Sequence, residues 1–233
     1  MNSAIVLEQP KARAPVTERD DDAPVFGEQR VFLENVSWKT FEALLKEKGD
    51  RGVPRFAYDD GVLEIMAPYF DHESSSTLID HMVYVLCEEL GIDCKGAGKL
   101  TCKRSKKKKG LEPDACFYIE NEALVRGKKR VDLKKDPPPD LMIEIDISRS
   151  SMDKFGIYAA LEVNEVWVFD GTTLAIFERR RNSYRELPFS PHFPGLPLTS
   201  KIPEILTRSE SIGDIAALKE FRAWVRSHTK KAR

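Results

Sequence analysis

The sequence contains only four cysteines among 233 residues, and no two of them lie at metal-binding spacing. They are Cys87, Cys94, Cys102 and Cys116, and the absence of any CxxC pair excludes a zinc ribbon. Cys87 and Cys116 stand among apolar residues, which is typical of small hydrophobic side chains in a core. A disulfide framework is not expected in a chain of this size.

An excess of charge of one sign is also missing. The chain has 37 lysines and arginines against 38 aspartates and glutamates, a net charge of −1. Proteins that coat nucleic acid without sequence preference are usually strongly basic, so any contact with DNA must come from a local patch. Composition alone favours an enzyme that acts on some other kind of substrate.

The chain lacks a hydrophobic run long enough to span a membrane. Its first 24 residues mix proline with charge and include a run of three aspartates, without the apolar stretch and cleavage site of a secretory signal. We therefore expect a cytoplasmic protein without a membrane partner, and a disordered arm over residues 1–24.

The remaining sequence shows the alternating patterns of an α/β domain, and its 41% hydrophobic content suits a full core. The patterns predict, in order, a helix from Ser37 to Gly49, a hairpin around Asp60-Gly61, a helix from Asp71 to Gly91, strands near 98–103, 113–120 and 140–148, a helix over 151–162, strands at 165–170 and 174–180, and an amphipathic helix over 211–231.

The middle of the chain thus reads helix, three strands, helix, strand. A strand–helix–strand unit implies a crossover and a parallel pair, so the predicted fold class is α/β with a mixed sheet. The apolar stripe of the C-terminal helix predicts packing on the domain or on a partner chain.

Two carboxylates share one face of the strand "LMIEIDIS". Side chains alternate across a strand, so Glu144 and Asp146 project on the same side. Buried carboxylates are costly unless something compensates them, and a divalent cation is the natural compensation. The alternative is that this face of the strand is exposed to solvent.

Two further residues join this pattern. Asp114 follows Pro113 at the opening of the preceding strand, which allows it to approach Glu144, although an ordinary Pro-Asp turn explains it equally. Lys154 stands in the first turn of the next predicted helix, where a cation opposes the helix dipole. Its spacing from Ile157 and Tyr158 places it on the sheet side, and the alternative is a lysine that extends to solvent.

The segments "GLEPDACFYIENE", "PPPDLMIEIDIS" and "KFGIYAALEVNEVWVFD" resemble the Uma-two family, described as putative restriction endonucleases of the PD-(D/E)XK nuclease superfamily. The hairpin "YDDGVLEIMAP" with "DHESSS", and the later "HFPGLPL", resemble the flanking segments of that family. The resemblance covers residues 25–206 and leaves 207–233 as a C-terminal helix and basic tail. It implies a restriction-endonuclease-like core, a Mg²⁺ or Mn²⁺ cofactor and products with a 5′-phosphate.

By position, the resemblance implies that Asp114 and Glu144 bind the metal. Lys154 and Tyr158 match the family's K-x-x-x-Y segment, with Lys154 as the catalytic lysine. The wider superfamily usually has lysine two residues after the second acid, and this chain has Asp146 there. Asp146 is then either an extra ligand or an outer group.

Three other features are weaker. Glu73 is a candidate outer metal ligand, against a helix-capping role, and His72 reads as a core histidine. Lys106, Lys107, Lys108 and Lys109 form a basic loop that could contact DNA phosphates or simply be solvated. His192, in a proline-rich loop, receives no role.

These observations favour a Mg²⁺-dependent endonuclease that hydrolyses DNA phosphodiester bonds. One alternative is a catalytically inactive nucleic-acid-binding module that keeps the nuclease fold, which Asp146 in the lysine position would suit. Another is a nuclease for RNA or a branched structure. A homodimer formed through the C-terminal helix is possible, because nucleases of this superfamily often cut both strands as dimers.

Overall fold

Two β-sheets form the frame of the protein, for which a computed structural model describes residues 28–147, 150 and 152–229. The arm expected over 1–24 lies outside the described residues. The first sheet is antiparallel throughout and has the order β1 (Gln29–Leu33), β3 (Val62–Ala67), β2 (Arg55–Asp59), β6 (Lys109–Leu111) and β5 (Cys102–Arg104). The second has the order β11 (Ser183–Leu187), β10 (Leu174–Arg180), β9 (Glu165–Phe169), β8 (Leu141–Ile145), β7 (Ala115–Tyr118) and β4 (Lys95–Gly96).

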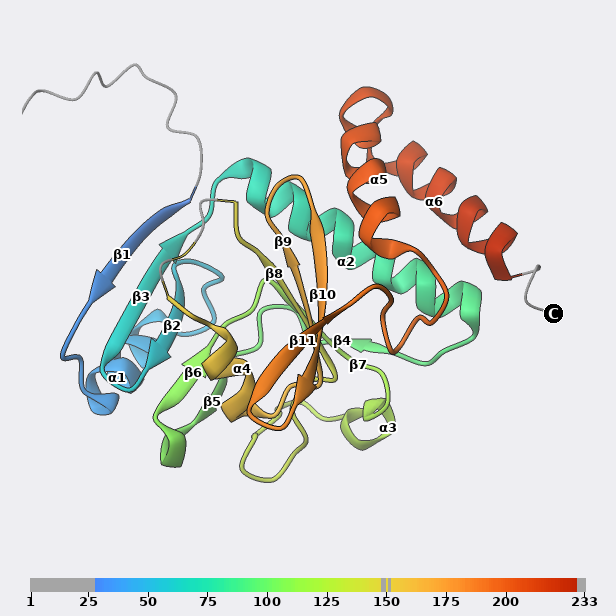
Figure 1. Cartoon of the computed structure of the whole chain (residues 1–233). Helices are drawn as coiled ribbons and strands as arrows, with labels where there is room; N and C mark the ends of the chain where they lie inside the picture. Colours follow the sequence, from blue (N-terminus) through green and yellow to red (C-terminus); the bar gives the residue numbers. More distant parts are fainter. Residues whose placement is uncertain (1–27, 148–149, 151, 230–233) are drawn as a thin grey trace, which may run out of the picture.

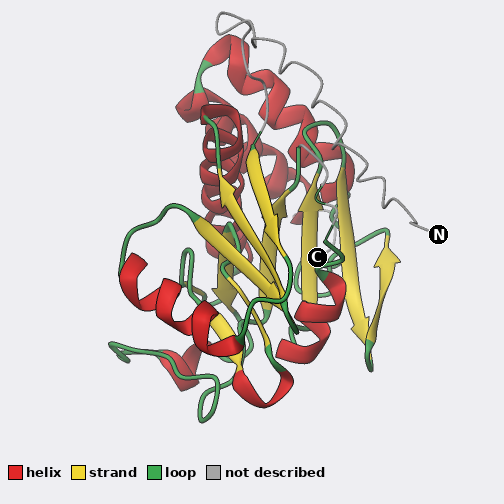
Figure 2. Cartoon of the chain, turned by 90° about the vertical axis from the view of Figure 1, so that its left-hand side faces the viewer, coloured by secondary structure: helices red, strands yellow, loops and turns green. Residues whose placement is uncertain are grey.

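Helices cover both sheets from outside and fill the space between them (Figure 1). They are α1 (Trp38–Lys48), α2 (Phe70–Leu90), α3 (Glu122–Val125), α4 (Phe155–Leu161), α5 (Leu198–Ile212) and α6 (Asp214–Thr229), with a 3-10 turn over Ser105–Lys107. A quarter turn of the view shows most of the strands in the middle of the molecule, with helices above and below them and one pair of strands at the right-hand edge (Figure 2).

The helix ends follow local capping chemistry, with one exception. The Ser37 hydroxyl accepts a hydrogen bond from the backbone of Thr40 at 3.1 Å, and Gly49 ends α1 with φ +60°, as predicted. Gly91 ends α2 in the left-handed region, also as predicted. The predicted cap at Asp71 is wrong, because α2 begins at Phe70 and Asp71 lies inside its first turn, where an acid favours the helix dipole.

The predicted order of helix, three strands, helix and strand matches α2, β4, β7, β8, α4 and β9, with β5 and β6 of the first sheet lying between β4 and β7 in the chain. Strands β4, β7 and β8 pair antiparallel in sequence order, and β9 returns after α4 to pair parallel with β8. The first of these strands is only Lys95–Gly96. The predicted strand near 98–103 is displaced to Cys102–Arg104, which pairs with β6 in the first sheet.

Both faces of β8 are buried, which removes the alternative that its Glu144 face is exposed. Leu141, Ile143 and Ile145 pack toward α2, α5 and α6, while Met142 packs toward α4 and the first sheet. The strand is shorter than predicted and ends at Ile145, so Asp146 follows it. Ser148, which strand alternation would place on the same face as Glu144 and Asp146, lies outside the described residues.

The predicted C-terminal helix is found as α6, which begins after Gly213, whereas the helix α5 that precedes it was not predicted. Helix α6 packs on α2 and α5 and buries Ala217, Phe221 and Val225 there, so the apolar stripe is used within the chain. Helix α5 runs across the boundary expected at 206, and the division into 25–206 and 207–233 remains a prediction. In the described part of the chain, no helix combines the length and the apolar character needed to cross a bilayer.

Candidate active site

The candidate site lies at the carboxyl end of β8, where β7 begins. The last paired residues in this register are Ala115 and Ile143, so one further step brings Asp114 level with Glu144. The backbone of Asp114 donates to the carbonyl oxygen of Ile143 at 3.2 Å, which continues the pairing. The strand register therefore juxtaposes the two acids that the sequence selected.

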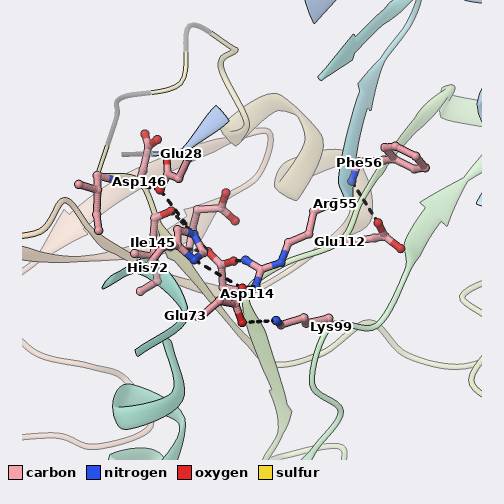
Figure 3. Close-up of polar contacts among 12 residues, drawn as sticks. Glu28, Arg55, Phe56, His72, Glu73, Lys99, Glu112, Asp114, Ile145 and Asp146 are labelled. Atoms are coloured by element: carbon pink, nitrogen blue, oxygen red, sulfur yellow. Dashed lines mark hydrogen bonds and ion pairs between the residues drawn. The ribbon is translucent and has the colours of Figure 1, made fainter. Parts of the chain in front are cut away.

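Asp114 is 3% exposed and divides its two oxygens between different partners. Oδ2 accepts a hydrogen bond from the backbone of Ile145 at 2.6 Å and lies 3.3 Å from His72 Nε2. Oδ1 forms an ion pair with the guanidinium of Arg55, which reaches it from the first sheet (Figure 3). One oxygen thus fixes the carboxylate to the strand, and the other faces a cation.

Glu144 is held in the same way by two residues of the α4 region. Its Oε1 forms an ion pair with Lys154, and its Oε2 accepts a hydrogen bond from the Tyr158 hydroxyl at 3.1 Å. Burial together with the charge of Glu144 raises the pKa of Tyr158, so its hydroxyl keeps the proton that it donates.

Lys154 faces the sheet, as its spacing predicts, with a side chain only 11% exposed. It does not lie in the first turn of α4 but immediately before Phe155, where the helix begins. Its Nζ lies 3.2 Å from Glu64 as well as against Glu144. Burial opposes the charge of Lys154, but these two carboxylates outweigh it and raise its pKa.

Among the described residues, Asp146 does not share a cation with Glu144. It accepts a hydrogen bond from Arg30 Nη2 at 3.0 Å and another from the backbone of Ser150 at 2.8 Å. Burial raises the pKa of Asp146 despite these contacts. A role as a metal ligand or an outer group therefore stays a prediction for Asp146.

The start of α2 brings His72 and Glu73 into the same region. His72 is 1% exposed, and its Nε2 donates to the carbonyl oxygen of Ile145 at 3.1 Å. Burial, and then the charge of Arg55, lower the pKa of His72 to about 4, so the ring is neutral at pH 7. Glu73 does not cap the helix; it pairs with Arg55 and, at 2.5 Å, with Lys99.

The basic loop lies at the other end of β6 from Asp114. Lys109 pairs with Asp59 and Lys108 lies 3.3 Å from Asp60, at the tip of the β2–β3 hairpin. Lys106 and Lys107 are exposed in the 3-10 turn. Two of the four lysines thus hold the hairpin tip, and DNA contact by the loop stays a prediction.

Five residues of the site were not found from the sequence: Glu28, Arg30, Arg55, Glu64 and Lys99. Arg55 and Glu64 lie on the two strands of the β2–β3 hairpin, and Glu64 is 1% exposed between apolar neighbours. A single charged residue inside an apolar strand, as at Glu64, was the signal in the sequence that could have identified it. Arg30 binds Glu64 at 2.5 Å and Glu28 at 2.6 Å, across segments with no shared local pattern.

Together these residues form what we call the charged cluster. Its described members are the acids Glu28, Glu64, Glu73, Asp114, Glu144 and Asp146, the cations Arg30, Arg55, Lys99 and Lys154, and neutral His72. The acids outnumber the cations by two.

This composition fits a hard divalent cation, which prefers carboxylate oxygens. A cavity of about 10 Å³, room for roughly one water, lies beside Glu144 and is also lined by Arg55, Glu64 and Lys154. Within the residues that the structure describes, no three histidine, cysteine or acidic side chains are gathered around one metal position. The donor chemistry fits a metal, whereas the acids face protein cations.

His192, to which the sequence assigned no role, lies outside the charged cluster. Its Nδ1 contacts Glu165, which is 1% exposed at the start of β9 and also accepts a hydrogen bond from Trp167 Nε1 at 2.5 Å. Since β8 and β9 are parallel and Leu141 pairs with Glu165, this contact is at the opposite end of the parallel pair.

Comparison with known proteins identifies the family of this chain. A protein from Anabaena variabilis, described as a "putative nuclease belonging to DUF820", is structurally similar with a TM-score of 0.48 and 15% sequence identity; the match covers 82% of this chain and 99% of that one. No curated protein matches the chain. Residues 38–208 match the Uma2 family, described as "Putative restriction endonuclease", and because this match spans most of the sequence, the chain belongs to that family.

Proposed function

We propose that this protein is a Mg²⁺-dependent endonuclease that hydrolyses phosphodiester bonds in DNA. The observation that carries the proposal is the position of Asp114 level with Glu144 at one end of the second sheet, with Lys154 in contact with Glu144. The membership of a restriction endonuclease family supports a nuclease. The proposal includes a cytoplasmic location, without a membrane partner.

Asp114 and Glu144 would hold the metal, which Mn²⁺ could replace. A bound divalent cation would activate a water molecule and offset charge on the scissile phosphate. Asp146, also at this end of β8, would act through the network around it, because Arg30 and Ser150 already hold its carboxylate.

Lys154 would neutralise charge that develops on the phosphate or orient the attacking water. Its raised pKa keeps it protonated at neutral pH, so it acts as a cation and not as a base. Tyr158 would orient Glu144 through its hydrogen bond, and Glu64 would position Lys154 from the other side.

A second candidate is a nucleic-acid-binding module that keeps the fold without turnover. The observation in its favour is that both acids already face protein cations, Asp114 facing Arg55 and Glu144 facing Lys154. Such a module would bind DNA without a metal and would cleave nothing.

Calorimetric titration with Mg²⁺ and Mn²⁺, followed by cleavage of circular and branched DNA and of RNA, tests the proposal. We expect the wild type to bind metal and cut DNA, and Asp114→Asn and Glu144→Gln to lose both activities. Asp140→Asn is the matched control, because Asp140 is equally buried but binds the backbone of Ile119 and Asn121. Metal binding that survives both site substitutions, or no cleavage with any metal, would contradict the proposal.

A further inference from the structure

Arg55 contacts one of the two candidate metal ligands and lines a small cavity with the other. Its side chain is 2% exposed and forms ion pairs with Asp114 and with Glu73. It lines the cavity together with Glu144 and Lys154. Arg55 is therefore a cation close to both acids.

The two carboxylate oxygens of Asp114 have different partners, and this difference shows which of them could bind a metal. Oδ2 is bound by the Ile145 backbone and lies near His72, so it is committed to the fold. Oδ1 is the oxygen that faces Arg55. A metal ligand needs an oxygen that is free to bind the ion, and at Asp114 this oxygen is held by the guanidinium.

A buried carboxylate needs a counter-charge in every state of the protein. Guanidinium remains charged at all accessible pH values, so Arg55 can serve Asp114 whenever a metal is absent. When a divalent cation supplies the same charge, the two cations repel each other across the same oxygen. Glu73 offers the displaced guanidinium a partner that it already contacts.

We propose that Arg55 is a resident cation of the metal site, which a divalent ion must displace from Asp114 in order to bind. This inference rests on the proposed metal-dependent function and adds a determinant of metal affinity. Arg55 keeps the metal-free protein folded and, by competing for Oδ1, weakens the binding of the ion.

The test compares Arg55→Met, Arg55→Lys and wild type by calorimetric titration with Mn²⁺ and by thermal unfolding with and without Mn²⁺. Lys99→Met is the control, since Lys99 also binds Glu73, through its other oxygen, but no contact with Asp114 is found among the described residues. Neither measurement depends on catalysis.

We expect Arg55→Met to bind Mn²⁺ at least tenfold more tightly than wild type. Its melting temperature should be lower without metal and should rise more on adding Mn²⁺. The Mn²⁺ affinity of Arg55→Lys should lie between those of wild type and Arg55→Met, because one ammonium cannot contact Glu73 and Asp114 as the guanidinium does. If Arg55→Met does not fold, Arg55→Lys replaces it in the test. Lys99→Met should change the affinity less than threefold.

The inference is overturned if wild type binds Mn²⁺ and both Arg55 variants bind it equally or more weakly, which leaves the proposed function standing. It is also overturned if Lys99→Met tightens binding as much as Arg55→Met, because the effect would then be general charge. Binding by Arg55→Met but not by wild type supports it. Failure of every variant to bind metal overturns both the inference and the proposed function.

Discussion

Two buried histidines lie at opposite ends of the β8–β9 pair, and their pKa values are shifted in opposite directions. The side chain of His192 contacts Glu165 and lies 3.8 Å from the exposed Glu120; burial opposes the charge of His192, but the hydrogen bond and charge of Glu165 outweigh burial and raise its pKa. His72 lies near Glu28 and Asp114, yet burial and the charge of Arg55 lower its pKa to about 4.

The difference lies in the kind of partner that each carboxylate has. We call Glu165 and His192 the closed pair, because the partners of the Glu165 carboxylate among the described residues, which are His192 and Trp167, include no permanent cation. In the charged cluster, every acid contacts at least one lysine or arginine, and the histidine stays neutral. A closed pair is suited to holding a fold, whereas a shared network can exchange one cation for another.

The largest effect is expected at Lys154, the cation on Glu144. Lys154→Met should lower cleavage roughly 10²–10³-fold, because it removes a charge aimed at the reacting phosphate. Lys48→Met is a matched control: Lys48 is buried to a similar degree but binds Glu112, at 2.5 Å, and not Glu144. Cleavage rates are compared at a temperature where both variants are folded. Equal losses of activity would show that the removal of any buried lysine near the cavity, and not the contact with Glu144, is responsible.

The second effect concerns stability at the other end of the sheet. His192→Gln should lower the free energy of unfolding by about 2 kcal/mol at pH 5.5, because a charged hydrogen bond to Glu165 is lost. Since the pKa of His192 is raised in the folded protein, its contribution is complete below the unfolded pKa of about 6.5 and is lost as the pH rises through the folded pKa.

Urea unfolding at pH 5.5 and pH 9 measures this contribution. The gap between wild type and His192→Gln should shrink at the higher pH, while DNA cleavage stays unchanged. His81→Gln, at an exposed position of α2, is the control substitution. A gap that widens with pH would contradict the closed-pair description.

A smaller effect is expected at Tyr158. Tyr158→Phe removes the hydroxyl that donates to Glu144 and should weaken Mn²⁺ binding about tenfold, as outer partners of metal ligands typically do. Tyr184→Phe is the control, because the Tyr184 hydroxyl donates to the Val163 carbonyl at 2.6 Å and its ring lies near that of Tyr158. Equal changes in calorimetric affinity would point to aromatic packing instead.

The smallest effect is expected in the basic loop. The double variant Lys106→Gln, Lys107→Gln should weaken DNA binding a few-fold and reduce the salt dependence by about two ion equivalents. Lys108→Gln should do less, because Lys108 lies beside Asp60. Binding titrations at several salt concentrations measure both. An unchanged salt slope in the double variant would mean that DNA does not reach this loop.

Periodic patterns carried most of the predicted fold. The α2 stripe, the hairpin around Asp60-Gly61 and the alternation in β8 each repeat within one segment, and all three appear in the structure. The two-residue strand β4 is too short to show a period, and α5, which was not predicted, contains Pro203, a residue that argues against a helix interior.

Part of the candidate site could be predicted from the sequence, because some of its residues lie on neighbouring elements. Asp114, Glu144 and Lys154 lie on adjacent elements, so strand order brings them together. Arg30 and Asp146 are 116 residues apart and lie on different parts of the fold, and no local rule links them. The contact of Arg55 with Asp114 likewise depends on how the two sheets dock.

The docking of the sheets also bears on synthesis of the chain. The charged cluster has members from Glu28 to Lys154, and its contacts cross from the β2–β3 hairpin to the second sheet. Contacts between distant residues form slowly, because the loops between them must close first. A nascent chain emerging from the ribosome therefore holds unmatched acids and arginines until α4 has been made, and any catalytic competence would arise only after most of the polypeptide has been released to fold.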